Sequence, residues 1–201
     1  MDQNLNERIR PYVSGFRYEH TLGVAEECDR LARIFGLSDR DTSDLHKAAL
    51  LHDLTKALRF DEQIALANDL GITLTEDDLK SPKILHQYTG AALAAKEFPD
   101  DTDERICKAI ACHTTGKADM SLFEKLLYLA DYIEPGRTYD DCVSVRERFY
   151  KNVRPNHKYK DLDEVILYSL RLTVSQLKAE NAPLHPKTLE AIAYLEKHNE
   201  K

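Results

Sequence analysis

The stretch Leu50-Leu51-His52-Asp53-Leu54-Thr55-Lys56 decides how this chain is organised. Apolar residues at helical spacing precede it, so we expect a helix over 44–56 with His52 on its buried face. Burying an imidazole beside a carboxylate is costly unless something compensates both groups, and a bound cation commonly does so. The alternative is a hydrogen-bonded His–Asp pair in an ordinary core. The positions of the other histidines decide between the two.

The composition favours one helical domain. The chain has 201 residues, 42% of them hydrophobic and 31% charged, which is enough for one sizeable core. Only seven glycines and seven prolines occur, and long stretches repeat their apolar residues every 3.6 positions. We therefore predict an all-α single domain over 1–201, with a core at about 14–137 and C-terminal helices over 138–201 packing on it.

Charge and cysteine content exclude several classes of partner. The net charge is −7, the sequence pI is near 5.6 and basic residues do not cluster, so a nucleic-acid partner is not expected. No apolar run reaches the ~18 residues of a membrane span, and the N-terminus lacks a signal peptide, so the prediction is a cytoplasmic protein without a membrane partner. The four cysteines contain no CxxC motif, which favours reduced core thiols.

The periodicity predicts a series of helices along the chain. Besides 44–56, the expected ranges are 5–13, 17–35, 61–70, 89–98, 102–113, 121–134, 140–150, 162–177 and 186–198. A polar break is expected over 38–43 and a loop over 71–83. The helix over 89–98 is rich in small residues, so a neighbouring segment can approach it closely.

Four histidines and two aspartates lie at the core-facing edges of these segments. They are His20, His52, Asp53, His86, His113 and Asp131. Each alone has an ordinary explanation, but six on five segments indicate a metal site. Imidazole and carboxylate ligands without thiolate suit iron, manganese or zinc. Six ligands exceed the needs of one ion and match two ions bridged by Asp53. Such a pair would carry out phosphoester or phosphoanhydride hydrolysis.

Cationic residues near the pair fit a phosphate ligand. Lys56 lies one turn after His52 and could reach a phosphate, although it could also pair with Asp53 or Asp61 at the surface. Arg17 and Arg137 could each grip a phosphate with two N–H groups, although an arginine is more commonly solvated.

Polar and aromatic residues offer further contacts. The stretch 114–116, Thr-Thr-Gly, offers hydroxyls and exposed backbone N–H groups to an anion, or is simply a helix end. Tyr132 and Tyr168 could stack on a base or serve as ordinary packing residues.

These motifs resemble a known family. The order His20, His52-Asp53 and Asp131 resembles the HD superfamily of metal-dependent phosphohydrolases. Over about residues 14–195 the fuller set is similar to its YqeK branch. The matching stretches are 17–21 (RYEHT), 51–56 (LHDLTK), His86, 111–116 (ACHTTG), 129–137 (LADYIEPGR) and 184–188 (LHPKT).

The resemblance implies an HD-domain helical bundle that cleaves diadenosine tetraphosphate (Ap4A) symmetrically to two ADP. A metal-activated water would attack a central phosphorus while Lys56 and Arg137 stabilise the charge of the leaving ADP. The implied cofactor is one or two ions of iron, with Mn²⁺ or another divalent metal as alternatives. The family also leads us to expect a homodimer.

The resemblance also implies roles for individual residues. The residues that hold one ion would be His20, His52, Asp53 and Asp131. His86 and His113 would either ligate a second ion or contact the phosphates, and they share the catalytic work with Asp53 and Lys56. The substrate contacts would be Arg17, His20, Asp53, Leu54, Thr55, Lys56, His86, His113, Thr114, Asp131, Tyr132, Arg137, Leu172, Thr173 and Leu177.

Two rival functions stay open at this point. One is another HD-type hydrolase: a deoxynucleoside monophosphatase, a (p)ppGpp hydrolase or a cyclic-dinucleotide phosphodiesterase. The second of these carries Glu-Asp where this chain has Lys56-Ala57, and the third needs a Gly-Tyr-Pro motif that is missing. The other rival is a non-catalytic nucleotide-binding module, which has no need of an open, phosphate-facing position.

Overall fold

The computed structural model describes residues 3–199, and within them every regular element is a helix, which confirms the all-α prediction. In chain order these elements are α1 (Gln3–Ile9), α2 (Phe16–Phe35), α3 (Asp39–Leu51), α4 (Phe60–Asp69), α5 (Glu76–Lys80), η1 (Pro82–Ile84), α6 (Leu85–Glu97), η2 (Pro99–Asp101), α7 (Glu104–Ile110), α8 (Leu122–Ile133), α9 (Asp140–Asn152), α10 (Lys158–Ala179) and α11 (Pro186–Asn199). None of the helices in this range is both long and apolar enough to cross a bilayer.

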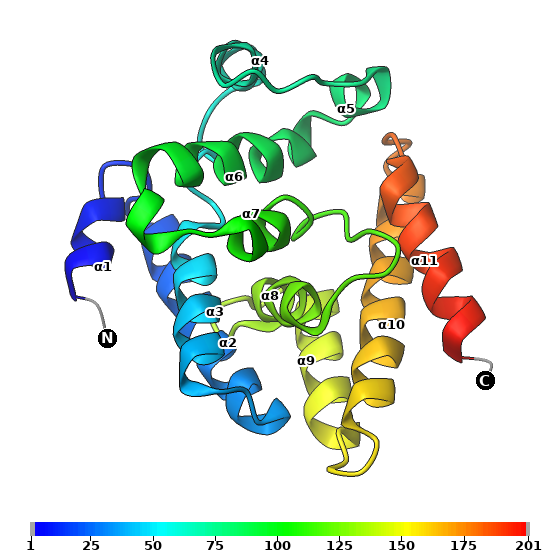
Figure 1. Ribbon diagram of the computed structural model, residues 1–201. Coiled ribbons are helices and arrows are strands. Elements are labelled where there is room, and N and C mark those ends of the chain that lie inside the picture. The colour runs from blue at the N-terminus through cyan, green and yellow to red at the C-terminus, as the bar shows by residue number, and fades with distance from the viewer. Residues whose placement is uncertain (1–2, 200–201) are drawn as a thin grey trace.

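The helices pack around α8. Figure 1 shows α2 and α3 side by side on one flank, α6 and α7 above α8, and α9, α10 and α11 on the opposite flank. One apolar cluster runs through the described residues from Leu5 in α1 to Leu195 in α11. The C-terminal helices thus share the core of the rest, as expected for one domain. The division of that domain at residue 137 stays a prediction.

The helix that carries the central stretch begins and ends earlier than expected. Ser38 caps it, accepting a hydrogen bond from the Asp41 backbone N–H at 3.1 Å, so the polar segment 38–43 opens the helix instead of interrupting the chain. The helix ends at Leu51, and residues 52–57 form turns. Side chains hold these turns: the Gln63 amide donates to the Thr55 carbonyl at 2.5 Å. His52 and Asp53 therefore leave the helix end and face the core.

Three further segments also differ from the prediction. The expected loop over 71–83 contains the short helix α5, capped by reciprocal hydrogen bonds between Thr75 and Asp78. Helix α6 begins at Leu85, so His86 lies in its first turn. Helix α7 ends at Ile110, and His113 lies in the turns that follow, although its side chain is buried as predicted.

Gly90 lets α6 approach the turn that carries the central pair. A Cβ on Gly90 would lie 3.3 Å from the His52 carbonyl oxygen and 3.5 Å from the Thr55 Oγ1. The Thr55 hydroxyl in turn donates to the His86 carbonyl at 3.1 Å. The small-residue helix thus holds the turn in place, as its composition predicted.

Replacing Gly90 with valine should force this contact apart. We expect the free energy of unfolding to fall by about 1–3 kcal/mol because the branched side chain overpacks the turn. Ala95 lies on the exposed face of the same helix, so Ala95→Val is the matched control, with an expected cost of about 0.5 kcal/mol from helix propensity. Denaturation of the chelator-treated proteins, followed by circular dichroism, measures both. Equal stability of the two variants would contradict the close approach.

Candidate metal centre

All six predicted side chains meet in one place. His20 comes from α2, His86 from α6 and Asp131 from α8, while His52, Asp53 and His113 come from the turns after α3 and α7. Asp131 Oδ1 lies 3.0 Å from His20 Nε2 and 3.7 Å from His52 Nε2. Asp53 Oδ1 lies 3.4 Å from His86 Nε2 and 3.6 Å from His113 Nε2. Segments more than a hundred residues apart thus place their polar atoms around a common point.

Hydrogen bonds at the far side of three rings fix which nitrogen faces this point. The Nδ1–H of His52 donates to the Ala49 carbonyl at 2.6 Å, and that of His113 to the Ile110 carbonyl at 2.7 Å. His20 Nδ1 donates to Glu134 Oε1 at 3.1 Å. With Nδ1 carrying the proton, the Nε2 atoms of His52 and His113 keep their lone pairs free for a cation, and the bond to Glu134 turns His20 Nε2 toward the same point.

Several inward atoms have no partner within the described chain. His20 Nε2, His52 Nε2 and Asp53 Oδ1 are buried without a hydrogen bond, and the short contact from His20 Nε2 to Asp131 lacks hydrogen-bond geometry. Buried polar atoms without partners are costly, and a cation would satisfy them all. Two groups have ligand atoms close enough for an ion: His20, His52 and Asp131, and His52, Asp53 and His113. The donor set therefore fits a divalent metal.

The shared histidine limits how ions can be arranged. His52 Nε2 has one lone pair and can bind only one ion, whereas a carboxylate has two oxygens and can bridge. Lys56 Nζ donates to His86 Nε2 at 2.9 Å, and the Thr114 hydroxyl lies 3.1 Å from the same nitrogen. A second ion at His86 would have to displace the lysine ammonium.

Charge is distributed unevenly in the cluster. Burial opposes ionisation of Asp53 and Asp131. The surrounding histidines and Lys56 nevertheless hold the pKa of the Asp53 carboxyl well below its usual value. Arg137 and the neighbouring histidines do the same for Asp131. Burial lowers the pKa of His52 to about 4, so its ring is neutral near pH 7. Burial acts in the same direction on His20, but Asp131 and Glu134 outweigh it and raise its pKa to about 9. A cation that binds here must displace the His20 proton.

The predicted arginines both contact the cluster. Arg17 Nη1 lies 3.2 Å from Asp53 Oδ2, and Arg137 Nη2 lies 2.6 Å from Asp131 Oδ1. Arg17 is about one-third exposed, and Arg137 is similarly accessible. Both are therefore placed between the carboxylates and the surface, where an incoming anion would arrive.

Comparison with known proteins agrees with this geometry. Residues 17–136 match the HD domain family, a range that spans most of the chain and includes all six clustered side chains. The chain belongs to the HD domain family.

Relatives of this HD domain protein include three proteins named symmetrical bis(5'-nucleosyl)-tetraphosphatase. That of Halalkalibacterium halodurans is 34% identical over 90% of this chain and 89% of its own length. Those of Staphylococcus aureus and Bacillus subtilis are 35% and 31% identical, over 89% and 90% of this chain and 86% and 89% of theirs. A crystal structure from Clostridium acetobutylicum, described as a predicted HD superfamily hydrolase involved in NAD metabolism, superposes with a TM-score of 0.84, at 30% identity and 98% coverage of both chains.

The Thr-Thr-Gly stretch of this HD domain does not offer free backbone donors. The amide oxygen of the buried Gln87 accepts from the backbone N–H groups of Thr114 and Thr115, both at 3.2 Å, and the Gly116 N–H donates to the Cys112 carbonyl. The expectation of exposed N–H groups is therefore wrong. What remains available to an anion is the Thr114 hydroxyl beside His86.

Sequence reasoning missed the residue that orients His20. Glu134 is 2% exposed and bonds both the His20 ring and the Gly136 backbone N–H, the latter at 2.6 Å. Gly23 makes room for it, because a Cβ there would lie 2.6 Å from Glu134 Oε2. The available signal was Gly23 itself, because a glycine in the interior of a long helix commonly has a packing reason.

The remaining predicted contacts fall into two sets. Leu54 and Thr55 are buried, so they support the turn from within. Thr173 and Leu177 of α10 line a cavity of about 260 Å³ together with Thr114 and Ile84, next to the metal cluster. Leu172 packs partly buried against the core.

The tyrosines proposed for base stacking are engaged elsewhere. Tyr132 donates to Asp141 at 2.9 Å and stacks on Tyr128, and the Tyr168 hydroxyl lies 3.0 Å from that of Ser144. Neither lines the cavity at Thr114.

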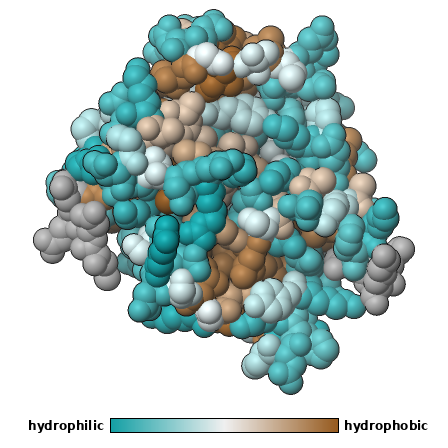
Figure 2. Space-filling model, viewed as in Figure 1, coloured by the Kyte–Doolittle hydropathy of each residue, from teal (hydrophilic) through white to brown (hydrophobic). Residues whose placement is uncertain are grey.

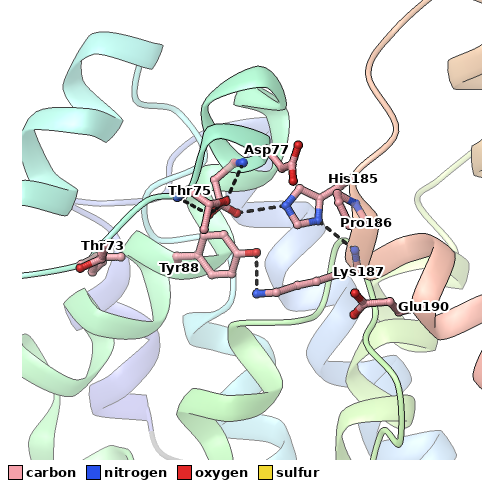
Figure 3. Close-up of a pocket in the computed structure, with 10 residues that line it drawn as sticks. Thr73, Thr75, Asp77, Tyr88, His185, Pro186, Lys187 and Glu190 are labelled. Atoms are coloured by element: carbon pink, nitrogen blue, oxygen red, sulfur yellow. Dashed lines mark hydrogen bonds and ion pairs between the residues drawn. The ribbon is translucent and has the colours of Figure 1, made fainter.

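The closing stretch 184–188 ties α11 to this region. His185 Nε2 lies 3.1 Å from Asp78 Oδ1, and Lys187 donates to the Tyr88 hydroxyl at 2.8 Å, across a cavity of about 380 Å³ (Figure 3). Thr188 donates to the Thr115 carbonyl at 3.0 Å. The first two contacts join α5, α6 and α11 around this cavity, and His185 and Thr188 also line the cavity at Thr173.

Replacing His52 with alanine should remove the metal. Because His52 belongs to both ligand groups, we expect metal content per chain to fall to near zero while the far-UV circular dichroism stays helical. Elemental analysis of anaerobically purified protein measures this. His46 pairs with Asp29 at 3.1 Å outside the cluster, so His46→Ala is the control and should keep its metal. A full metal complement in His52→Ala would contradict the assignment.

Proposed function

We propose that this protein is a symmetrical dinucleoside tetraphosphatase that hydrolyses Ap4A to two ADP with a bound divalent cation. The observation that carries the proposal is the cluster of buried, unpartnered lone pairs with phosphate-reaching cations at its rim. Relatives of nearly the same length that bear this activity as their name support it.

The site residues divide into a cation-holding set and a phosphate-contacting set. We assign His20, His52, Asp53 and Asp131 to the cation. When bound, a divalent ion would polarise a phosphoryl oxygen and lower the pKa of a coordinated water to near neutrality. Iron is the ion we propose, because the family resemblance implies it and the nitrogen and oxygen donors suit it.

The phosphate-contacting set begins with His86, Lys56 and Thr114. The Lys56 ammonium and the Thr114 hydroxyl both meet His86 at its Nε2, and these residues line the two neighbouring cavities. Burial lowers the pKa of Lys56, but Asp53 and Asp131 oppose this effect, and the ammonium stays close to the carboxylates. It can therefore neutralise charge that develops on the bridging oxygen.

The proposed reaction uses these residues, the bound cation and one water molecule. Water oxygen forms a bond to one central phosphorus, the bond from that phosphorus to the central bridging oxygen breaks, and the departing ADP keeps the electron pair. Arg137 and Arg17 can exchange their carboxylate partners for the phosphates that flank the reacting one. Two ADP molecules result from Ap4A and one water. A homodimer stays a prediction from the family resemblance, and a cytoplasmic location stays a prediction from the sequence.

Product analysis separates this function from its rivals. The protein is incubated anaerobically with Fe(II) or Mn(II) and, separately, with Ap4A, dAMP, ppGpp or cyclic di-GMP, and the products are resolved by chromatography. We expect ADP as the sole product from Ap4A and slow or no turnover of the others. Release of ATP and AMP from Ap4A, faster cleavage of dAMP, or a rise in melting temperature with Ap4A and no turnover would each reject the proposal.

Replacing Lys56 with alanine should lower kcat without removing the metal. Loss of one group that stabilises transition-state charge typically costs about 10²–10³ in kcat, and Lys56 belongs to neither ligand group. Steady-state kinetics with Ap4A and elemental analysis of the same sample measure the two effects. Lys108 pairs with Glu104 on the surface, so Lys108→Ala is the control. Wild-type kcat in Lys56→Ala would remove the lysine from the mechanism.

A further inference from the structure

A second cavity borders the cluster at His86, and Thr173 does not line it. It has a volume of about 300 Å³ and includes Lys56, Leu58, Phe60, Pro82, Lys83 and His86 in its lining. Lys56 and His86 belong to the candidate site, so this cavity opens directly onto the place where the phosphates would lie. The short helix η1 separates it from the cavity at Thr114, because Pro82 and Lys83 line both.

Both cavities have the charge of a site for anions. The chain has 35 acidic and 28 basic residues, yet no Asp or Glu is among the described residues that line either cavity. Lys56 and Lys83 line one cavity, and Lys80 and Lys83 line the other. By contrast, the cavity in Figure 3 is lined by Asp77, Asp78 and Glu190.

The lining of the second cavity includes two exposed apolar residues. Phe60, the first residue of α4, is 43% exposed and Leu58 is 38% exposed, and Figure 2 shows apolar residues gathered over α4. Gln63 also lines the cavity, but it is 3% exposed and its amide bonds the Thr55 carbonyl and the Thr89 hydroxyl inside the protein, so it offers little to a ligand. An exposed aromatic ring beside lysines and without free amides suits stacking on a nucleobase.

We propose that the cavity at Phe60 binds the second nucleoside of the dinucleoside tetraphosphate, while the cavity at Thr173 and Leu177 binds the first. This inference rests on the proposed function. Symmetrical cleavage places the broken bond midway between two nucleosides, so a nucleotide must extend from the cluster in two directions. The two cavities lie on either side of η1 and meet the cluster at His86 and Thr114, which provides both directions.

Stacking also predicts the specificity of this subsite. Every base has an aromatic face, and Phe60 offers no hydrogen bond to distinguish adenine from guanine. The second nucleoside is therefore bound without strong preference between purines.

The test compares ligands with two nucleosides and with one. For Phe60→Ala we expect the KM for Ap4A to rise about 10- to 100-fold, because loss of a stacking ring weakens binding by that order. Adenosine 5'-tetraphosphate, used as a competitor of Ap4A turnover, has one nucleoside that can occupy the Thr173 cavity, so its Ki should stay within about twofold of wild type. Tyr159 is an exposed aromatic residue outside both cavities, at 57%, and Tyr159→Ala is the matched control.

An activity-independent measurement accompanies the kinetics. Calorimetric titration with ADP should give two sites per chain for wild type and one for Phe60→Ala. An unchanged KM for Ap4A, an equal rise in KM and in the Ki of adenosine tetraphosphate, or one ADP site in both proteins would overturn the subsite. If wild type does not convert Ap4A to ADP, the proposed function fails, whereas Ap4A turnover that ignores Phe60 removes only the subsite.

Discussion

The structure depends on one constraint: three histidine rings must each direct Nε2 to a common point. A hydrogen bond at Nδ1, on the opposite side of each ring, imposes this orientation. His52 and His113 are held by carbonyls of their own helix ends, three residues earlier, and His20 is held by Glu134 from a distant helix. Each ring therefore has a defined orientation before any ligand arrives. Arg17 and Arg137 offset part of the cost of burying these groups beside two ionised carboxylates, and a bound cation would offset more of it, so metal binding would stabilise the fold.

The helix ends, more than the helices, build the site. Helices α3 and α7 both stop just short of their histidines, and the turns that follow bend the side chains toward α8. At two contacts around the site a neighbouring segment comes so close that only glycine leaves enough room. Gly90 lies against the His52 carbonyl, and Gly23 lies against the Glu134 side chain. A helix that continued through Asp53, as the apolar pattern suggests, would leave its carboxylate on a different face from the His52 ring because consecutive helical residues lie about 100° apart.

Helical periodicity was sufficient to predict the fold class and the buried faces that carry His20, His52, His113 and Asp131, because burial of a helical residue follows from its neighbours at three and four positions along the chain. It was not sufficient for contacts made between distant segments. Glu134 and Gln87 look like ordinary helix-end residues in the sequence, yet one orients His20 and the other takes up the N–H groups of Thr114 and Thr115. The helix α5 was missed for a similar reason: its five residues have no apolar repeat, and its cap is visible only once Thr75 and Asp78 are seen together.

A symmetrical substrate does not require a symmetrical site. Attack on either central phosphorus of a dinucleoside tetraphosphate gives the same two products, so a single chain needs only one orientation of the phosphates and can bind the two halves in unlike cavities. The two cavities here differ in this way: Leu177 and Ile84 form an apolar wall beside threonines in one, whereas Phe60 presents its ring to solvent in the other. In the proposed complex the phosphates between them would face Arg17, Lys56 and Arg137, so charge would fix the position of the scissile bond while a different surface holds each nucleoside.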